Sequence, residues 1–141
     1  MTATALLSRL LPALLAVFLL PNAARCADGK EAAPATAVQR VNVDEYEKLR
    51  AGTNVVILDV RSAAEFQKGH IPGAINIDIN SPRFAELTAP LDKSKTYLVN
   101  CAVGMRSARA CKKLESSGFK TLYDLAPGFD GWKKAGKPVQ K

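Results

Sequence analysis

The stretch TYLVNCAVGMRS, residues 96–107, decides how the rest of the chain is interpreted. It opens with a strand-like segment, Thr96–Asn100, in which three apolar side chains follow one another. A cysteine and a short loop containing Gly104 come next, and residues 107–117 have the pattern of a helix that stops at Gly118. The stretch therefore predicts a strand–loop–helix unit with Cys101 at the carboxyl end of the strand.

The same alternation recurs on both sides of this unit. Residues 55–58 form a continuous apolar run rich in β-branched side chains, which is typical of a strand buried on both faces of a parallel sheet. Five strand-then-helix units within about a hundred residues predict an α/β fold with an open, mainly parallel five-stranded sheet. Right-handed crossovers would place helices on both faces of that sheet. The other expected strands are 40–42, 74–77 and 122–123, and the other helices are 45–50 capped by Asp44, 63–66 capped by Ser62, 81–87 with Pro82 in its first turn, and 129–134.

Cys101 is the candidate nucleophile because ligands bind at the carboxyl ends of strands in such sheets. A loop between a strand and a helix turns successive backbone N–H groups inward and forms a nest for an anion. The following helix adds a partial positive charge at its N-terminus, and Arg106 adds a full one. All three favour the thiolate, which is the reactive form of cysteine. The alternative is a buried structural cysteine, and the hypothesis requires that the amides face the sulfur and that solvent reaches it.

Three blocks of sequence resemble the rhodanese domain family, from roughly Val38 to Val139. The first comprises LDVRSAAEF at 58–66 and GHIPGAINI at 69–77, and it is similar to the family's first signature. The second, Cys101 to Arg106, is similar to the six-residue active-site loop, and the third, GFDGW at 128–132, to the C-terminal signature. The third block has Pro127 where the family often has a glycine.

The resemblance implies a sulfurtransferase with no cofactor. Cys101 would take a sulfane sulfur from a small anionic donor, hold it as a persulfide and pass it to a thiol or to cyanide, by covalent catalysis in two half-reactions. Arg106 would bind the donor, and the loop would supply backbone N–H groups and the pocket wall through Ala102, Val103, Gly104 and Met105. Many members that use thiosulfate have a basic residue where this chain has Ala102, so one cationic contact with that donor is missing.

Three other functions compete with turnover on small molecules. A sulfur carrier would accept persulfide from one protein partner in a sulfur relay and deliver it to another, and an inactive scaffold would use neither Cys101 nor Arg106. An arsenate reductase or phosphatase is disfavoured because those relatives have one more residue in the loop. Nucleic acid is not expected as a partner, because the lysines behind the net charge of +7 are scattered. No metal site is expected from a single histidine without a cysteine pair at ligand spacing.

Several polar residues near the loop are expected to support it. Asp59 and Arg61 follow the other buried strand and are interpreted as an ion pair that braces the loops, with Arg61 facing the substrate as the alternative. Glu65 is expected to join this network, and Ser107 to assist at the start of the helix. His70 is expected to be a turn residue rather than a general base. The remaining predictions are structural: Cys111 inert and unpaired with Cys101, and Phe129 and Trp132 in the core.

Residues 1–27 are predicted to be a secretory signal peptide that is cleaved near residues 26/27. An apolar run of eleven residues lies between Arg9 and Arg25, too short for a bilayer span of about 20 residues. Small residues follow it, and the segment contains no acid. A lipidated Cys26 and a mitochondrial transit peptide are the alternatives, disfavoured by the bulky Arg25 and by the low arginine content. Residues 28–37 are expected to be a flexible leader, 38–139 the rhodanese-like domain, and the mature protein periplasmic or secreted, without a membrane span.

Overall fold

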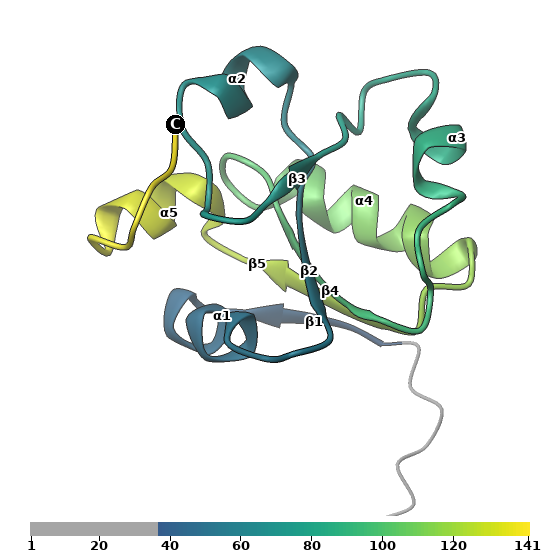
Figure 1. The fold of residues 1–141 in the computed structure, drawn as a ribbon, viewed down its shortest axis with the longest axis horizontal. Coiled ribbons are helices and arrows are strands. Elements are labelled where there is room, and N and C mark those ends of the chain that lie inside the picture. Colours follow the sequence, from purple (N-terminus) through teal and green to yellow (C-terminus); the bar gives the residue numbers. More distant parts are fainter. Residues whose placement is uncertain (1–36) are drawn as a thin grey trace, which may run out of the picture. The chain divides into compact units, whose positions relative to one another are not determined.

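The computed structural model describes residues 37–141 (Figure 1). They form one five-stranded sheet in the order β1-β5-β4-β2-β3, and every neighbouring pair of strands is parallel. The predicted α/β fold with an open, mainly parallel sheet is confirmed. The elements in chain order are β1 (Ala37–Val41), α1 (Val43–Arg50), β2 (Val55–Asp59), α2 (Ala63–Gln67), β3 (Ile75–Asn76), α3 (Phe84–Thr88), β4 (Thr96–Asn100), α4 (Met105–Ser116), β5 (Thr121–Leu125) and α5 (Gly128–Lys134).

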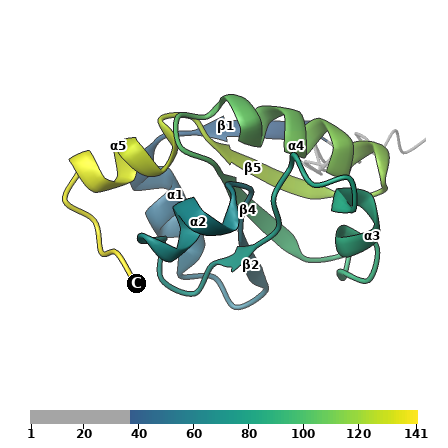
Figure 2. The same ribbon diagram turned by 90° about the horizontal axis from the view of Figure 1, so that it is seen from above.

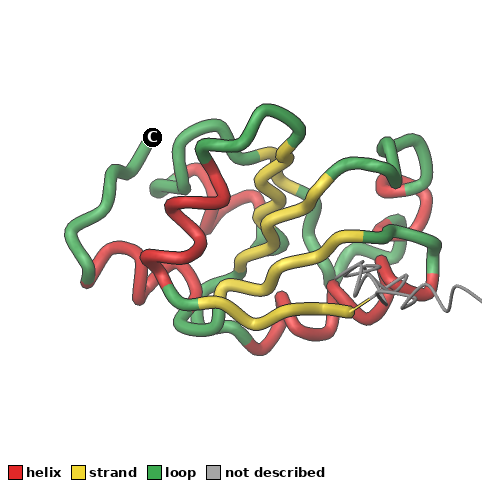
Figure 3. The backbone as a smooth tube through the Cα atoms, turned by 90° about the horizontal axis from the view of Figure 1, so that it is seen from below, coloured by secondary structure: helices red, strands yellow, loops and turns green. Residues whose placement is uncertain are grey.

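Side chains alternate across the sheet and so divide the core into two clusters. In β4, Tyr97 and Val99 belong to the cluster that includes Leu114 of α4, whereas Leu98 between them belongs to the cluster that includes Trp132 of α5. The helices therefore lie on both faces of the sheet, as predicted, with α4 and α1 on opposite sides (Figure 2). Figure 3 shows the strands side by side between these helical layers. β4 lies between β2 and β5 in the sheet, which places Cys101 at the edge where several parallel strands end.

The starts of α1 and α3 differ from the sequence prediction. α1 begins at Val43 because Asn42, not Asp44, is its N-cap: the Asn42 side chain accepts a hydrogen bond from Glu45 N at 2.9 Å and completes a capping box. α3 begins at Phe84 rather than near Pro82, since residues 81–83 form a turn. Both errors arise because several residues in a row suit a helix start, and tertiary packing selects among them.

The strands are also longer than predicted at the edge formed by β1. β1 runs from Ala37 to Val41 and pairs along its whole length with β5, from Ala37 opposite Thr121 to Val41 opposite Leu125. The last residue assigned to the flexible leader is therefore the first residue of the sheet. The predicted signal peptide and the rest of that leader lie outside the described residues. Within residues 37–141, no helix has both the length and the apolar character needed to cross a membrane.

Candidate active site

The loop after β4 owes its shape to a glycine. Gly104 has φ +84°, in the left-handed region that other residues rarely adopt, and a Cβ placed there would overlap the carbonyl oxygen of Ala126. This conformation brings Gly104 N to 3.1 Å from Cys101 Sγ and lets α4 begin at Met105, two residues earlier than the sequence predicts. The path of the loop and the direction of its amides are therefore fixed by the same residue.

The sulfur of Cys101 accepts hydrogen bonds from the loop and from the first turn of α4. Besides Gly104 N, the Ser107 hydroxyl donates to Cys101 Sγ at 3.4 Å. Burial on its own raises the pKa of the Cys101 thiol, but hydrogen bonds from Ser107, Val103 and Gly104 lower it, and the net pKa lies below its ordinary value. The geometry therefore favours the thiolate, the form required of a nucleophile.

Cys101 has no exposed surface in this conformation. Two backbone hydrogen bonds from α5 fix the position of its loop. Phe129 N donates to Cys101 O at 2.7 Å, and Asp130 N donates to Ala102 O at 3.0 Å. Gly128 allows this close approach, since a Cβ at that position would overlap Ala102 O. The requirement for inward amides is met, whereas the requirement for solvent access is not. A donor can reach the sulfur only if the loop or its surroundings move, and two neighbours of the sulfur lie at the surface: Val103 is 58% and Met105 76% exposed.

Arg106 is engaged by a carboxylate. Its guanidinium donates two hydrogen bonds to Glu65 of α2, at 2.8 and 2.7 Å. The Arg106 guanidinium lowers the pKa of Glu65 to about 2, and Glu65 in turn raises the pKa of Arg106. The prediction that Glu65 joins the Asp59–Arg61 network is therefore wrong. The physical reason is that Glu65 points from α2 toward the Cys101 loop and pairs with Arg106, which offsets much of the charge that Arg106 brings to this loop.

Asp59 and Arg61 form the predicted brace. Arg61 Nη2 lies 2.6 Å from Asp59 Oδ2 and also donates to Gly69 O at 2.8 Å, with both charged side chains buried. The guanidinium carbon of Arg61 lies 4.1 Å from the centre of the Phe129 ring. Through Arg61, this ion pair connects the end of β2 with α5, the helix whose backbone hydrogen-bonds to the Cys101 loop. Arg61 also lines a cavity of about 270 Å³ that Ala102 borders.

His70 and Cys111 have the structural roles predicted for them. His70 Nδ1 lies 3.1 Å from Phe66 O, and its backbone exchanges two hydrogen bonds with Gln140. Cys111 is buried and, like Cys101, forms no disulfide, and burial raises the pKa of its thiol far above the ordinary value. Within the described part of the chain, no three His, Cys, Asp or Glu side chains are grouped so that they could hold a metal ion.

Two residues near the loop were missed by the sequence analysis. Asp124 of β5 is completely buried, and Arg40 of β1 lies 3.1 Å from it through Nε. The only sequence signal was an aspartate directly after the predicted strand 122–123, which is ordinarily the sign of a strand end.

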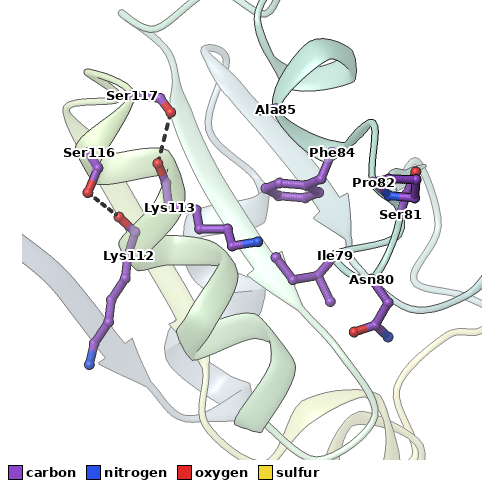
Figure 4. Close-up of a pocket in the computed structure, with 10 residues that line it drawn as sticks. All are labelled: Ile79, Asn80, Ser81, Pro82, Phe84, Ala85, Lys112, Lys113, Ser116 and Ser117. Atoms are coloured by element: carbon purple, nitrogen blue, oxygen red, sulfur yellow. Dashed lines mark hydrogen bonds between the residues drawn. The ribbon is translucent and has the colours of Figure 1, made fainter.

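A separate cavity of about 660 Å³ lies between α3 and the second half of α4, and no residue of the Cys101 loop lines it (Figure 4).

Fold and loop together define an α/β domain with a cysteine in the loop after a central strand of the sheet, and the comparisons identify the family. Residues 42–135 match the Rhodanese-like domain, so the chain belongs to the rhodanese-like domain family. The Bacillus subtilis protein named "Putative sulfurtransferase YtwF" is 37% identical over 65% of this chain and 86% of its own length. A thiosulfate sulfurtransferase GlpE from Pseudomonas savastanoi is 33% identical over 70% and 90%. The crystal structure of a rhodanese-related protein from Thermoplasma volcanium has a TM-score of 0.62 and 33% identity, over 72% of this chain and 97% of its own.

One relative is named for a carrier. The Bacillus subtilis "Putative sulfur carrier protein YrkF" is 29% identical over 70% of this chain and 52% of its own length. The family thus includes proteins named as sulfurtransferases and as sulfur carriers, and both kinds of name concern the handling of sulfur.

Proposed function

We propose that this protein is a sulfurtransferase that carries a sulfane sulfur on Cys101. The observation that supports this most directly is the cysteine sulfur itself, which accepts hydrogen bonds from Gly104 N and from the Ser107 hydroxyl. These two hydrogen bonds stabilise negative charge on Cys101 before the sulfur-donating substrate binds. They do so again when Cys101 becomes the leaving group. The relatives named as sulfurtransferases support the same reaction class.

The reaction comprises two displacements without net oxidation or reduction. In the first, the Cys101 thiolate attacks the outer sulfur of the donor. A bond forms between the two sulfurs, the bond inside the donor breaks, and the remainder of the donor leaves with the electron pair. In the second, a thiolate or cyanide attacks the outer sulfur of the persulfide, and Cys101 leaves as a thiolate.

The donor that best fits this site carries less charge than thiosulfate. The position after the cysteine is Ala102, and Arg106 is already paired with Glu65 at 2.7 Å. Neither residue offers an uncompensated cation to a dianion. A low-molecular-weight persulfide, with a single negative charge on its outer sulfur, makes less demand on such cations. We therefore expect a higher kcat/KM for a persulfide donor than for thiosulfate.

A sulfur carrier is the second candidate, supported by the relative named as a carrier and by a sulfur without exposed surface. A carrier needs a partner to open the loop, whereas an enzyme opens it unaided. Turnover of thiosulfate or persulfide with cyanide by the pure protein, compared with Cys101→Ser, separates the two. Turnover that depends on Cys101 supports the enzyme, and a stable persulfide without turnover supports the carrier.

A phosphatase or arsenate reductase is the remote third candidate, and the short loop argues against it. From Cys101 to Arg106 the loop has six residues, and its last residue is bound to Glu65 rather than free to hold a tetrahedral oxyanion. We expect no hydrolysis of an aryl phosphate and no reduction of arsenate. Either activity, lost in Cys101→Ser, would replace the sulfurtransferase proposal.

We also propose that the protein is exported, to the periplasm or outside the cell. The support is the sequence of residues 1–27 alone, with an apolar run that follows Arg9 and precedes small residues. Expression with the native N-terminus and mass measurement of the mature chain test this. Cleavage near residues 26/27 is expected, and an intact N-terminus in the cytoplasmic fraction contradicts export.

A further inference from the structure

Asp124 is a charged residue in a place where an apolar one would be easier to accommodate. It lies on β5 without exposed surface, between Arg40 of β1 and Val99 of β4 in the sheet register. Neither of its carboxylate oxygens accepts a hydrogen bond from the described residues. Burying an ionised carboxylate costs several kcal/mol unless it is paired and hydrogen-bonded. Burial accordingly raises the pKa of Asp124, although Ser107 and Arg40 partly counteract this.

Ser107 connects Asp124 to the active-site sulfur. Its hydroxyl donates to Cys101 Sγ at 3.4 Å and forms no hydrogen bond with Asp124 in this conformation, although a hydrogen bond from Ser107 would lower the pKa of that carboxyl. A serine hydroxyl carries one proton and can donate it to only one acceptor at a time. With the proton directed at the sulfur, Asp124 is left without a hydrogen bond, which is the arrangement in the structure.

Arg40 decides this competition by offsetting the charge of Asp124. Its Nε lies 3.1 Å from Asp124 Oδ2, and its side chain is 57% exposed, so it covers the buried carboxylate from the solvent side. Arg40 Nη2 also donates to Ala126 O at 3.4 Å, and Ala126 O is the atom that packs against Gly104. Arg40 therefore contacts both the carboxylate that competes for the Ser107 proton and the strand end that shapes the loop.

We propose that Asp124 is a positioning residue: acting through the single proton of Ser107, and restrained by Arg40, it sets how strongly the protein holds negative charge on Cys101 Sγ. An anion that binds Arg40 and draws it away would leave the charge of Asp124 uncompensated. The Ser107 proton would then turn toward Asp124, and the Cys101 thiolate would lose a stabilising hydrogen bond. This inference deepens the proposed function, since it rests on Cys101 as the reacting group.

The other ionisable groups near this network keep a constant charge around neutral pH. Tyr46 of α1 and Cys111 of α4 both interact with Asp124, but burial raises the pKa of each, so both stay uncharged. Arg106 of α4 interacts with Cys101 and stays charged, because Glu65 raises its pKa. Between about pH 5 and pH 9 these groups therefore do not add a titration of their own to the reactivity profile of Cys101.

The test is the pH dependence of Cys101 alkylation by iodoacetamide in three variants of the full chain. Arg40→Gln leaves Asp124 uncompensated, so the midpoint of the alkylation profile is expected to rise by about one pH unit. Asp124→Asn removes both the like charge and the competitor for the Ser107 proton, so the midpoint is expected to fall by a similar amount. In the double variant the effect of Arg40→Gln is expected to disappear, because its target is gone.

Arg109→Gln is the matched control for the loss of an arginine. Arg109 lines the same 490 Å³ pocket as Arg40, but its side chain donates to Asn80 Oδ1 at 3.5 Å instead of pairing with Asp124. It is expected to leave the midpoint unchanged. The inference is overturned if Arg40→Gln and Asp124→Asn shift the midpoint in the same direction, or if the Arg40→Gln shift persists in the double variant. Arg40 is on the surface, so Arg40→Gln is expected to fold, and an unchanged midpoint in this variant overturns the inference even if Asp124→Asn does not fold. Alkylation requires no sulfur transfer, so the result is independent of the proposed function.

Discussion

Replacing Gly104 with alanine tests whether one backbone conformation creates the thiolate site. Gly104 has φ +84°, and Gly73 has φ +82°, but the surroundings differ. A Cβ at Gly73 meets nothing within 4 Å, whereas a Cβ at Gly104 overlaps Ala126 O and lies 3.0 Å from Arg40 Nη2. Gly73→Ala is therefore a control for backbone strain without a clash.

The expected magnitudes follow from these two environments. A left-handed alanine costs about 1–2 kcal/mol, and this is the whole effect expected for Gly73→Ala. Gly104→Ala adds an overlap with a backbone atom, which cannot rotate away, and such overpacking costs about 1–3 kcal/mol more. We expect Gly104→Ala to lower the free energy of unfolding by about 2–5 kcal/mol in total. If the loop moves to relieve the overlap, Gly104 N also leaves the sulfur.

Urea unfolding and the pH dependence of Cys101 alkylation measure the two consequences separately. Gly73→Ala should keep the wild-type alkylation profile despite its loss of stability. Gly104→Ala should shift the midpoint of that profile upward, since a hydrogen bond to the thiolate is lost. Equal losses of stability in the two variants, together with an unchanged profile in Gly104→Ala, would refute the reasoning.

Three further predictions concern neighbouring residues. Glu65→Gln should cost about 1 kcal/mol of stability, because the Glu65 side chain is 37% exposed and solvent screens its pair with Arg106. Arg106 lowers the pKa of Glu65 to about 2, so this contribution is present above about pH 4.5 and is lost as the pH falls toward 2. Urea unfolding at pH 7 and pH 2 should therefore show a difference between the variant and the wild type only at pH 7. Ala102→Arg should raise kcat/KM for thiosulfate about tenfold by supplying the missing cation, and steady-state kinetics with no gain would contradict the expectation that Ala102 limits the use of thiosulfate. Cys111→Ala should leave the Cys101 alkylation rate unchanged, since the Cys111 thiol is buried and its pKa is raised.

Sequence patterns predicted the elements whose signals are local. The apolar run that became β2 and the strand that became β4 were assigned within one residue of their observed ends, because burial on both faces leaves a continuous apolar pattern. The position of Cys101 after such a strand placed it at the correct edge of the sheet. The Asp59–Arg61 pair was also predictable, since only one residue separates the two in the chain.

The contacts that the sequence did not reveal join residues far apart in the chain. Glu65 and Arg106 are 41 positions apart, and their pairing depends on how α2 is turned over the loop. Glu65 was assigned to Asp59 and Arg61 only because they are close in sequence. Asp124 lies 84 positions from Arg40 in the chain. It is buried because β1 pairs with β5 and α4 packs on β5, and the sequence around residue 124 indicates neither contact. The loss of solvent access at Cys101 depends in the same way on α5.

The most direct test is a peptide-mapped mass spectrum of the protein after incubation with a persulfide or thiosulfate donor. Cys101→Ser serves as the control, and unreacted donor is removed beforehand. One additional sulfur atom on the peptide that contains Cys101, absent from the peptide that contains Cys111 and from the control variant, is the result we expect. A native, folded protein that gains no sulfur from either donor, or gains it on Cys111, would contradict the assignment of Cys101 as the sulfur-carrying residue.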